Sequence, residues 1–460
     1  MQSESVAPPT PYYDPIIFHN ILDGIDRRRC LVATYYVEDR VPGEDFLDHF
    51  SLIQSLALEG STGTWEKVEE DTPEVRARLS GKLVGYYEIP STALGTGPST
   101  ESDTKRAVVQ LAFPIDAWEA NVPMMLLSVA GNCFAYSPRM RLLDFAAPDD
   151  LLAQFQGPKF GVPGVREMMG IAQRPLSLHI IKPKMGMTPE NTAHQVYQTC
   201  LGGVDMVKDD EMCSDVYNCK FEDRLTAVLA AIERAADKTG KRPIYFVSIT
   251  DEVDKIVPKA LRAIELGASG LLLTYSAGLS ALRVLTSRAD VNVPVLLHAS
   301  HMIAAQPRIA WPVFAKLCRL CGADLMLTPT YWSSIPMVSL EEGIRTAQVK
   351  LAPWQHIKPT WPMPCAGVYP GLTEILVREY GTDIVIPAGG GMLGHPMGYT
   401  AGAKAWQQAI EVVMAGRSLK EAAGDYPELH AAVEKWGIPE RPRTHWLRAD
   451  PRFHPKTTRG

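Results

Sequence analysis

The sequence predicts an α/β fold in which an N-terminal α+β domain precedes a parallel (β/α)8 barrel, the TIM-barrel architecture. Eight short apolar runs alternate with helix-like stretches in the later part of the chain, which is the count that such a barrel requires. Polar and charged residues stand at the ends of several runs, where barrel sites are built. Residues 1–150 show a different pattern and are expected to form a separate domain.

The N-terminal domain, residues 1–150, is expected to mix strands with one amphipathic helix. Its expected strands lie at 31–38, 81–90, 107–115 and 121–132, and its expected helix lies at 45–60. Residues 144–164 are rich in proline and glycine and are expected to connect the two domains. The barrel domain then occupies 151–437, and the basic, proline-rich residues 438–460 are expected to be a poorly ordered tail.

The barrel strands follow from the positions of the eight apolar runs. The expected strands lie at 177–184, 204–210, 244–250, 270–275, 293–300, 323–329, 357–364 and 383–390. This arrangement explains where the unusual side chains of the chain occur. Lys182, Lys208, His298, Cys365 and Gly389 all fall at the C-terminal ends of their strands.

Composition excludes several classes of protein. The chain has 46 basic and 52 acidic residues with mixed signs, so nothing indicates nucleic-acid binding. No apolar run approaches the roughly 18 residues of a membrane span, and the N-terminus does not resemble an export signal, so a cytoplasmic protein is expected. Eight cysteines in 460 residues indicate reduced thiols. Cys318 and Cys321 form a CxxC pair, which is expected to be buried in a helix rather than to bind zinc.

The run GGVDMVKDDE at 202–211 places a lysine and acids at the end of an apolar stretch. Side chains alternate along a strand, so Lys208 and Asp210 are expected to face one way and Asp209 the other, while Glu211 bends inward from the following loop. Two interpretations remain open. Lys208 is neutralised by salt bridges, or its amine takes up carbon dioxide and the resulting carbamate joins Asp210 and Glu211 as a ligand for Mg²⁺.

A second run, IIKPKMGM at 180–187, places Lys182 and Lys184 on one face of another apolar strand. By itself this pattern is also typical of a solvated strand end. Next to the acidic cluster of the following strand, the two lysines are instead interpreted as substrate-binding and proton-transfer groups around a metal.

These two runs, together with STGTW at 61–65, GN at 131–132 and GGGMLGHPMG at 389–398, resemble the ribulose bisphosphate carboxylase large-chain superfamily. The resemblance covers nearly the whole chain, with the motifs in the same order. It implies a ferredoxin-like N-terminal domain and one Mg²⁺ per subunit, held by carbamylated Lys208, Asp210 and Glu211. Lys182 matches the lysine that moves protons to and from an enediolate, and His298 matches a further site residue. Lys184 has either a catalytic or a structural role.

The same resemblance implies a phosphate pocket and an oligomer. The residues that match phosphate- or substrate-binding positions are Glu59, Thr64, Trp65, Asn132, Gly367, Gly389, Gly390 and Gly391. The N-terminal members of this set reach the barrel of a neighbouring subunit in the superfamily, which implies a homodimer with a shared active site. His395 also matches a site position but is expected to be structural, and His301 is not assigned a role.

Two departures from the carboxylase indicate a different reaction. The second phosphate pocket of the family uses an arginine, a histidine and a serine, and this chain has Ala299, Leu327 and Cys365 instead. The loss of charge-assisted hydrogen bonds favours a substrate with one phosphate. The loop at 328–340 contains no lysine, which argues against carbon dioxide fixation. Its aromatic pair, Tyr331 and Trp332, closes over the site or simply packs.

The resemblance is therefore to the non-fixing members of the superfamily, the RuBisCO-like proteins. The favoured reaction is Mg²⁺-dependent decarboxylation of 3-oxo-isoapionate 4-phosphate, because loss of the carboxyl group yields the same enediolate that the carboxylase forms. A transcarboxylase or hydrolase acting on that substrate remains open. So does an enolase or isomerase of the 5-methylthioribulose phosphate type. A non-enzymatic, regulatory barrel is disfavoured, because Lys182, Lys208, Asp210 and Glu211 are all retained and unpaired buried acids are costly.

Overall fold

The computed structural model describes residues 25–38, 49–64, 66, 68–89, 105–137, 139–213, 215–332 and 338–440. The chain divides into two compact units. The first comprises Met1–Phe155 and Ala305–Val313, and the second comprises Gln156–Ala304 and Phe314–Gly460. Trp65 and the tail after residue 440 lie outside the described residues, so the expectations for them stay untested.

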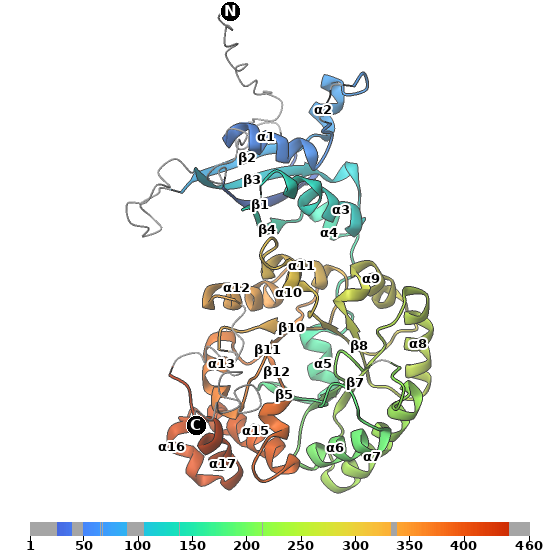
Figure 1. Cartoon of the computed structure of the whole chain (residues 1–460), viewed down its shortest axis with the longest axis vertical. Coiled ribbons are helices and arrows are strands. Elements are labelled where there is room, and N and C mark those ends of the chain that lie inside the picture. The colour runs from blue at the N-terminus through green and yellow to red at the C-terminus, as the bar shows by residue number, and fades with distance from the viewer. Residues whose placement is uncertain are drawn as a thin grey trace, which may run out of the picture. The chain divides into compact units, whose positions relative to one another are not determined.

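The first unit has a four-stranded antiparallel sheet in the order β2-β3-β1-β4 (Figure 1). Its strands are β1 (Cys30–Glu38), β2 (Lys82–Glu88), β3 (Arg106–Pro114) and β4 (Arg141–Ala146). Its helices are α1 (His49–Glu59), α2 (Pro73–Leu79), α3 (Val122–Ala130) and α4 (Asp149–Leu152), with short 3-10 turns η2 (Ile115–Ala117) and η3 (Asn132–Ala135). The β1-α1-β2-β3-α3-β4 core and this strand order confirm the ferredoxin-like domain.

The expectation of a strand at 121–132 was wrong, because most of this segment forms α3. Asn121 caps the helix by accepting a hydrogen bond from the Met124 backbone N–H at 3.2 Å, and a proline occupies the first turn, where it is tolerated. Val122, Met125 and Val129 are buried with helical spacing. The fourth strand is β4, which overlaps the start of the expected connection.

The second unit contains eight parallel strands in one sheet, as predicted (Figure 1). They are β5 (Leu176–Ile180), β6 (Met206–Lys208), β7 (Ile244–Ser248), β8 (Gly270–Thr274), β9 (Val295–His298), β10 (Leu325–Pro329), β11 (Trp361–Cys365) and β12 (Val385–Ala388). Each one overlaps a predicted run, and only β5 and β11 extend one residue beyond it, at Leu176 and Cys365. β12 pairs with β5, and the outer strands β11 and β12 contact each other, so the sheet closes into a barrel.

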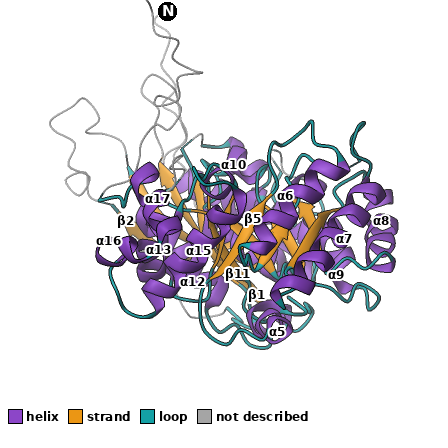
Figure 2. Ribbon diagram, turned by 90° about the horizontal axis from the view of Figure 1, so that it is seen from below, coloured by secondary structure: helices purple, strands orange, loops and turns teal. Residues whose placement is uncertain are grey.

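Helices surround these strands (Figure 2). They are α5 (Gly161–Met169), α6 (Pro189–Leu201), α7 (Phe221–Thr239), α8 (Val253–Glu265), α9 (Leu279–Ser287), α10 (Met302–Ala305), α11 (Trp311–Leu320), α12 (Leu340–Leu351), α13 (Thr373–Tyr380), α14 (Gly390–Leu393), α15 (Tyr399–Met414), α16 (Leu419–Ala422) and α17 (Pro427–Trp436). Three further 3-10 turns are η4 (Tyr275–Ala277), η5 (Pro370–Leu372) and η6 (Ala423–Asp425). No helix in the described part of the chain is long and apolar enough to cross a membrane.

Helix α5 covers the amino-terminal end of the barrel. The backbone N–H groups of Phe160 and Gly161 both donate to the Asp324 carboxylate at 2.8 Å, and Asp324 directly precedes β10. Arg166 of the same helix pairs with Asp383, which precedes β12. Because these partners stand just before their strands, the opposite, carboxyl-terminal end is the one left for a functional site.

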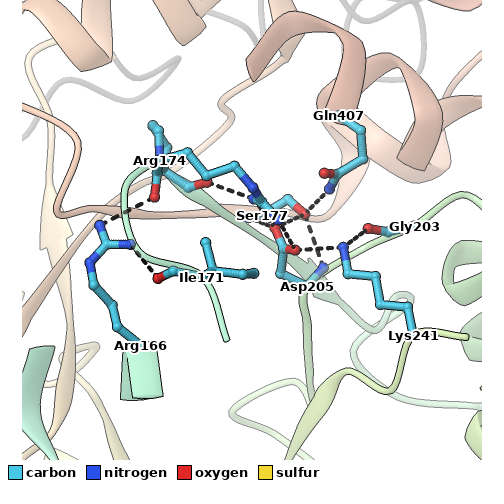
Figure 3. Close-up of polar contacts among 9 residues, drawn as sticks. Arg166, Ile171, Arg174, Ser177, Gly203, Asp205, Lys241 and Gln407 are labelled. Atoms are coloured by element: carbon cyan, nitrogen blue, oxygen red, sulfur yellow. Dashed lines mark hydrogen bonds and ion pairs between the residues drawn. The ribbon is translucent and has the colours of Figure 1, made fainter. Parts of the chain in front are cut away.

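A buried ionic network braces the same amino-terminal end (Figure 3). The fully buried carboxylate of Asp205, which precedes β6, accepts hydrogen bonds from Arg174 at 2.7 and 2.8 Å and from Lys241 at 2.6 Å. The backbone N–H of Ser177 in β5 donates to it at 2.8 Å, and Gln407 of α15 donates to the Ser177 hydroxyl at 2.6 Å. The network therefore links β5 and β6 to each other and to helix α15.

Candidate active site

The side chains singled out in the barrel converge at the carboxyl-terminal ends of neighbouring strands. Lys182 lies two residues beyond β5, Lys208 is the last residue of β6, and His298 is the last residue of β9. The loop after β6 carries Asp210 and Glu211 among these strand ends. The spacing of polar residues after apolar runs thus predicted a real cluster.

Lys208 is fully buried, and its Nζ donates a hydrogen bond to the backbone carbonyl of Asp209 at 2.7 Å. Burial lowers the pKa of this amine, although the nearby charges of Glu211 and Asp210 oppose that shift. A lowered pKa enriches the neutral amine, which is the form that can add carbon dioxide. The environment of Lys208 is therefore chemically suited to carbamate formation.

The two carboxylates of the loop after β6, those of Asp210 and Glu211, each contact a lysine of the loop after β5. Lys182 donates to Asp210 Oδ2, and Lys184 donates to Glu211 Oε1. Asp210 is fully buried, whereas the Lys182 side chain is 32% exposed. The second predicted run and the acidic run thus meet in space, as the alternation of side chains along the strands indicated.

His298 contacts the same cluster from β9. Its Nε2 lies 3.3 Å from Glu211 Oε2, and its Nδ1 accepts a hydrogen bond from the backbone N–H of Ser300, also at 3.3 Å. This arrangement assigns the ring proton of the neutral imidazole to Nε2. Burial, reinforced by the charge of Lys208, lowers the pKa of His298 to about 3, so the ring is neutral at ordinary pH.

Sequence reasoning missed a residue that positions Lys182. Gln195 of α6 accepts a hydrogen bond from the Lys182 backbone N–H at 3.1 Å and donates to the Lys182 carbonyl at 2.7 Å. Its Oε1 also lies 3.1 Å from the ring of the buried His179. A buried glutamine on the inner face of an amphipathic helix is the signal that could have identified it.

The glycines assigned to phosphate binding follow two neighbouring strands, β11 and β12. Gly367 has a positive φ of 74°, which favours glycine. A Cβ on Gly391 would lie 1.9 Å from the Val368 carbonyl oxygen, so the two glycine-bearing loops pack against each other. A Cβ on Gly389 would lie 3.2 Å from the Lys182 side chain, whereas one on Gly390 would meet nothing within 4 Å. The predicted phosphate loop therefore adjoins the lysine–carboxylate cluster.

The remaining predicted binding residues belong to the first unit. Glu59 ends α1 and accepts a hydrogen bond from the Tyr136 hydroxyl at 3.2 Å, while the exposed Asn132 begins the adjacent turn η3. Thr64 is exposed in the loop after α1. Glu59 and Asn132 are thus brought near each other within the first unit, separately from the barrel residues.

The positions of the second phosphate pocket hold no charged group. Ala299 and Leu327 are buried, and burial raises the pKa of the Cys365 thiol to about 12, so it stays neutral. In the loop after β10, Trp332 donates to Glu379 of α13 at 2.6 Å, and its ring contacts that of Tyr331 edge to face. These contacts agree with the packing interpretation, and closure of the loop over the site stays a prediction.

Three further predictions concern residues that were not expected to take part in catalysis or metal binding. Cys318 and Cys321 are buried, free thiols as expected, Cys318 within α11 and Cys321 one residue beyond its end. His395 is 5% exposed and forms hydrogen bonds with the Glu428 carbonyl at 2.8 Å and the Met397 backbone N–H at 3.1 Å, which is a structural role. His301 is exposed.

The carboxylates of Asp210 and Glu211 fit Mg²⁺, and a carbamate on Lys208 would add a third oxygen ligand. Among the described residues, no three His, Cys, Asp or Glu side chains are close enough to hold a metal ion. Asp210 and Glu211 supply hard oxygen donors, and each already attracts a cationic lysine. A carbamate on Lys208 would supply the third oxygen donor, which Mg²⁺ prefers over nitrogen or sulfur.

Together, these features define a (β/α)8-barrel protein with a ferredoxin-like domain and a lysine–carboxylate site at the carboxyl-terminal ends of its strands. The chain belongs to the ribulose bisphosphate carboxylase large-chain family. Residues 161–436 match the catalytic domain of that large chain, and residues 26–151 match its N-terminal domain.

Individual relatives agree with this assignment. A ribulose bisphosphate carboxylase-like protein from Archaeoglobus fulgidus is 37% identical over 403 residues, covering 86% of this chain and 90% of that protein. A 2,3-diketo-5-methylthiopentyl-1-phosphate enolase from Geobacillus thermodenitrificans is 33% identical over 419 residues, covering 89% of this chain and 98% of that protein. These non-carboxylase names match the expected non-fixing branch.

Solved structures show the same fold. The octameric ribulose-1,5-bisphosphate carboxylase/oxygenase of Pyrococcus horikoshii superposes with a TM-score of 0.82 at 31% identity, covering 92% of this chain and 97% of that one. A dimeric archaeal Rubisco from Hyperthermus butylicus superposes with a TM-score of 0.79 at 29% identity, covering 90% of this chain and 97% of that one. Both dimeric and octameric assemblies therefore occur among structural relatives.

Proposed function

We propose that this chain is an Mg²⁺-dependent enzyme that forms an enediolate from a keto substrate carrying one phosphate. The observation that carries this proposal is the contact of Lys182 with Asp210 beside the buried amine of Lys208. A proton-transfer group, two carboxylates and a reactive amine meet at the ends of the neighbouring strands β5 and β6. Among the described residues, no carboxylate lies at hydrogen-bond distance from the buried Lys208 amine. A purely structural salt bridge would not explain such a lysine.

Each residue has a distinct role in this proposal. Carbamylated Lys208, Asp210 and Glu211 would hold Mg²⁺, which would supply positive charge to stabilise negative oxygens of the substrate. Lys182 exchanges a proton with the substrate carbon, and Gln195 fixes the backbone that carries it. His298 stays neutral and orients Glu211 by donating from Nε2.

The two candidate pockets limit the number of phosphate groups that the substrate can carry. Gly367 and the run Gly389–Gly391 offer backbone N–H groups without side-chain obstruction, and Thr64 and Trp65 complete this pocket in the proposal. The positions of Ala299, Leu327 and Cys365 offer no cation. A bisphosphate would therefore bury one phosphate without charge-assisted hydrogen bonds, which supports a monophosphate.

The specific reaction that we propose first is decarboxylation of a 3-oxo sugar acid, namely 3-oxo-isoapionate 4-phosphate. The bond between the carboxyl carbon and its neighbour breaks, carbon dioxide leaves, and the electron pair forms the enediolate. Lys182 then gives a proton to the carbon. The lysine-free loop at 328–340 supports release of carbon dioxide rather than its capture. A transcarboxylase or hydrolase acting on the same carboxyl group would bind the substrate through the same site residues.

A second candidate is an enolase or isomerase acting on a methylthio-sugar phosphate. The relative named 2,3-diketo-5-methylthiopentyl-1-phosphate enolase favours this reading, since 89% of this chain aligns with it. In this case Lys182 removes a proton from the substrate and no carbon is lost. The enediolate and the single phosphate are common to both candidates.

The site is proposed to be completed by a second copy of the chain. Glu59, Thr64, Trp65 and Asn132 belong to the N-terminal domain, and their match to substrate-binding positions implies a homodimer with a shared active site. A mixture of Lys182→Met and Asn132→Ala subunits tests this arrangement. Each variant alone is expected to be inactive, and the mixture is expected to regain activity, since one site per heterodimer is then intact.

The reaction is tested with Mg²⁺, bicarbonate and a panel of monophosphorylated 3-oxo sugar acids and keto sugars in D₂O. Release of carbon dioxide with deuterium in the product establishes the decarboxylase. Deuterium exchange without carbon loss establishes the enolase or isomerase. The Lys182→Met variant serves as a control that should lose deuterium incorporation in either case, and absence of both signals in the wild-type protein contradicts the proposal.

A further inference from the structure

Ser248, the last residue of β7, has a buried hydroxyl that no contact explains. The residue is 0% exposed, and its Oγ has no hydrogen-bond partner among the described residues. An unpaired buried hydroxyl costs free energy, so such groups normally have a partner. The neighbouring hydroxyls of Thr250 and Thr274, in contrast, lie 3.0 Å apart and are paired.

The strand register places this hydroxyl on the same side of the sheet as Lys208. Lys208 pairs with Phe246 of β7, and residues paired across parallel strands point to the same side of the sheet. Ser248 lies two residues beyond Phe246 and therefore faces the same side as Lys208, one step nearer the carboxyl-terminal end. The ladder continues past Lys208, because the Asp209 backbone N–H donates to the Phe246 carbonyl at 3.1 Å. Ser248 thus stands alongside Asp210.

The end of β7 is fixed relative to β6 by the outward carboxylate of Asp209. Its Oδ2 accepts the Ser248 backbone N–H at 2.9 Å and the Arg224 side chain at 3.1 Å. The backbone of Ser248 is therefore held in place while its hydroxyl points to the other side. A hydroxyl held this way can act as a preorganised donor.

The residues paired with Lys208 on the two adjacent strands cannot serve as such a donor. On β5 the paired residue is Ile180, and on β7 it is Phe246, and neither side chain can form a hydrogen bond. A carbamate on Lys208 would have two anionic oxygens. If one oxygen faces the cation shared with Asp210 and Glu211, the other needs a donor from the barrel wall.

We propose that the Ser248 hydroxyl donates a hydrogen bond to a carbamate oxygen on Lys208 and so acts as a positioning residue for the metal ligand. This inference rests on the proposed function, since it requires the carbamate. The neutral amine adds to carbon dioxide, a nitrogen–carbon bond forms, and one proton leaves to solvent. The step involves no oxidation or reduction.

The test uses ¹³C-bicarbonate and Mg²⁺ with the full-length protein and measures the carbamate signal by ¹³C NMR as bicarbonate is titrated. Ser248→Ala is expected to need about tenfold more bicarbonate for half-maximal signal, because a hydrogen bond to a charged group is lost. Its folding should be preserved, since the substitution removes an unpartnered group. Ser269→Ala is the matched control, because that hydroxyl accepts from Tyr245 at 2.9 Å before β8, at the opposite end of the barrel.

The outcomes separate this inference from the proposed function. An unchanged bicarbonate requirement in Ser248→Ala overturns the role of Ser248 and leaves the carbamate in place. An equal rise in Ser248→Ala and Ser269→Ala also overturns it, because the effect would then be general destabilisation. Absence of a carbamate signal in the wild-type protein overturns both this inference and the proposed ligand set.

Discussion

Asp209 and Asp210 are adjacent in the chain, but their carboxylates lie on opposite faces of the sheet at the end of β6. Asp209 accepts hydrogen bonds from Tyr245 at 2.6 Å and from Arg224 at 3.1 Å, behind the strand. Asp210 contacts Lys182 inside the site. Two neighbouring acids therefore have separable roles, one in stability and one in the candidate chemistry.

The first prediction compares the variants Asp209→Asn and Asp210→Asn. Asp209→Asn breaks a fully buried ion pair and is expected to lower the free energy of unfolding by about 3 kcal/mol. Asp210→Asn is expected to change stability little but to abolish the rise in melting temperature that Mg²⁺ with bicarbonate produces, because a ligand is lost. Urea unfolding and thermal melts measure both effects. Equal destabilisation by the two variants would contradict the separation of roles.

The second prediction concerns Lys208. Lys208→Ala is expected to abolish activity and weaken Mg²⁺ binding, since both the amine and its carbamate are removed. Activity assays and Mg²⁺ titration by calorimetry measure these effects. Lys184→Ala is the comparison, because this half-exposed lysine touches Glu211 without being a ligand, and it should retain Mg²⁺ binding. Activity of Lys208→Ala within about twofold of the wild type would remove the carbamate from the proposal.

The third prediction tests the phosphate loop with two neighbouring glycines. A Cβ at position 391 would lie 1.9 Å from the Val368 carbonyl, so Gly391→Ala is expected to lower the melting temperature markedly. Nothing lies within 4 Å of a Cβ at position 390, so Gly390→Ala should keep the stability of the wild type. If the loop binds phosphate, Gly390→Ala raises KM for the phosphorylated substrate. An unchanged KM would show that Gly390 only forms a turn.

The fourth prediction is a pH dependence of stability caused by Lys350. This fully buried amine in α12 donates to the Met326 carbonyl at 3.0 Å and to the Thr328 hydroxyl. Burial lowers its pKa to about 7, although the buried thiols of Cys318 and Cys365 oppose the shift. The unfolded chain keeps this proton up to a pKa of about 10.4. Between these values the unfolded state binds more protons, so stability rises with pH.

Lys350→Met removes this titration and keeps most of the side-chain volume. From pH 7.5 to 9, the wild-type protein is therefore expected to gain roughly 1.4 kcal/mol of unfolding free energy per pH unit relative to the variant. Urea unfolding at several pH values measures the difference. Parallel pH profiles for the two proteins would show that Lys350 remains charged in the folded state.

The sequence predicted the barrel well because each of its strands is a short apolar run bounded by polar residues. It also predicted which side chains meet, since carboxyl-terminal strand ends share one face of a barrel. The segment at 121–132 was misassigned because a continuous apolar stretch has no clear period, and the capping role of Asn121 decided the outcome. Gln195 and Ser248 were not found, because their importance depends on burial and on partners distant in the sequence.

The last prediction separates stability from activity at the two ends of the barrel. Asp205→Asn leaves the cations of Arg174 and Lys241 without their shared carboxylate and is expected to cost about 3 kcal/mol of unfolding free energy. Because this network precedes β5 and β6 while the site follows them, the folded variant should keep its kcat and KM below its melting temperature (Figure 3). Arg262→Met, which breaks an exposed pair with Glu222, is the control and should change neither property. A loss of kcat in folded Asp205→Asn would instead show that the amino-terminal network transmits strain along β6 to Lys208.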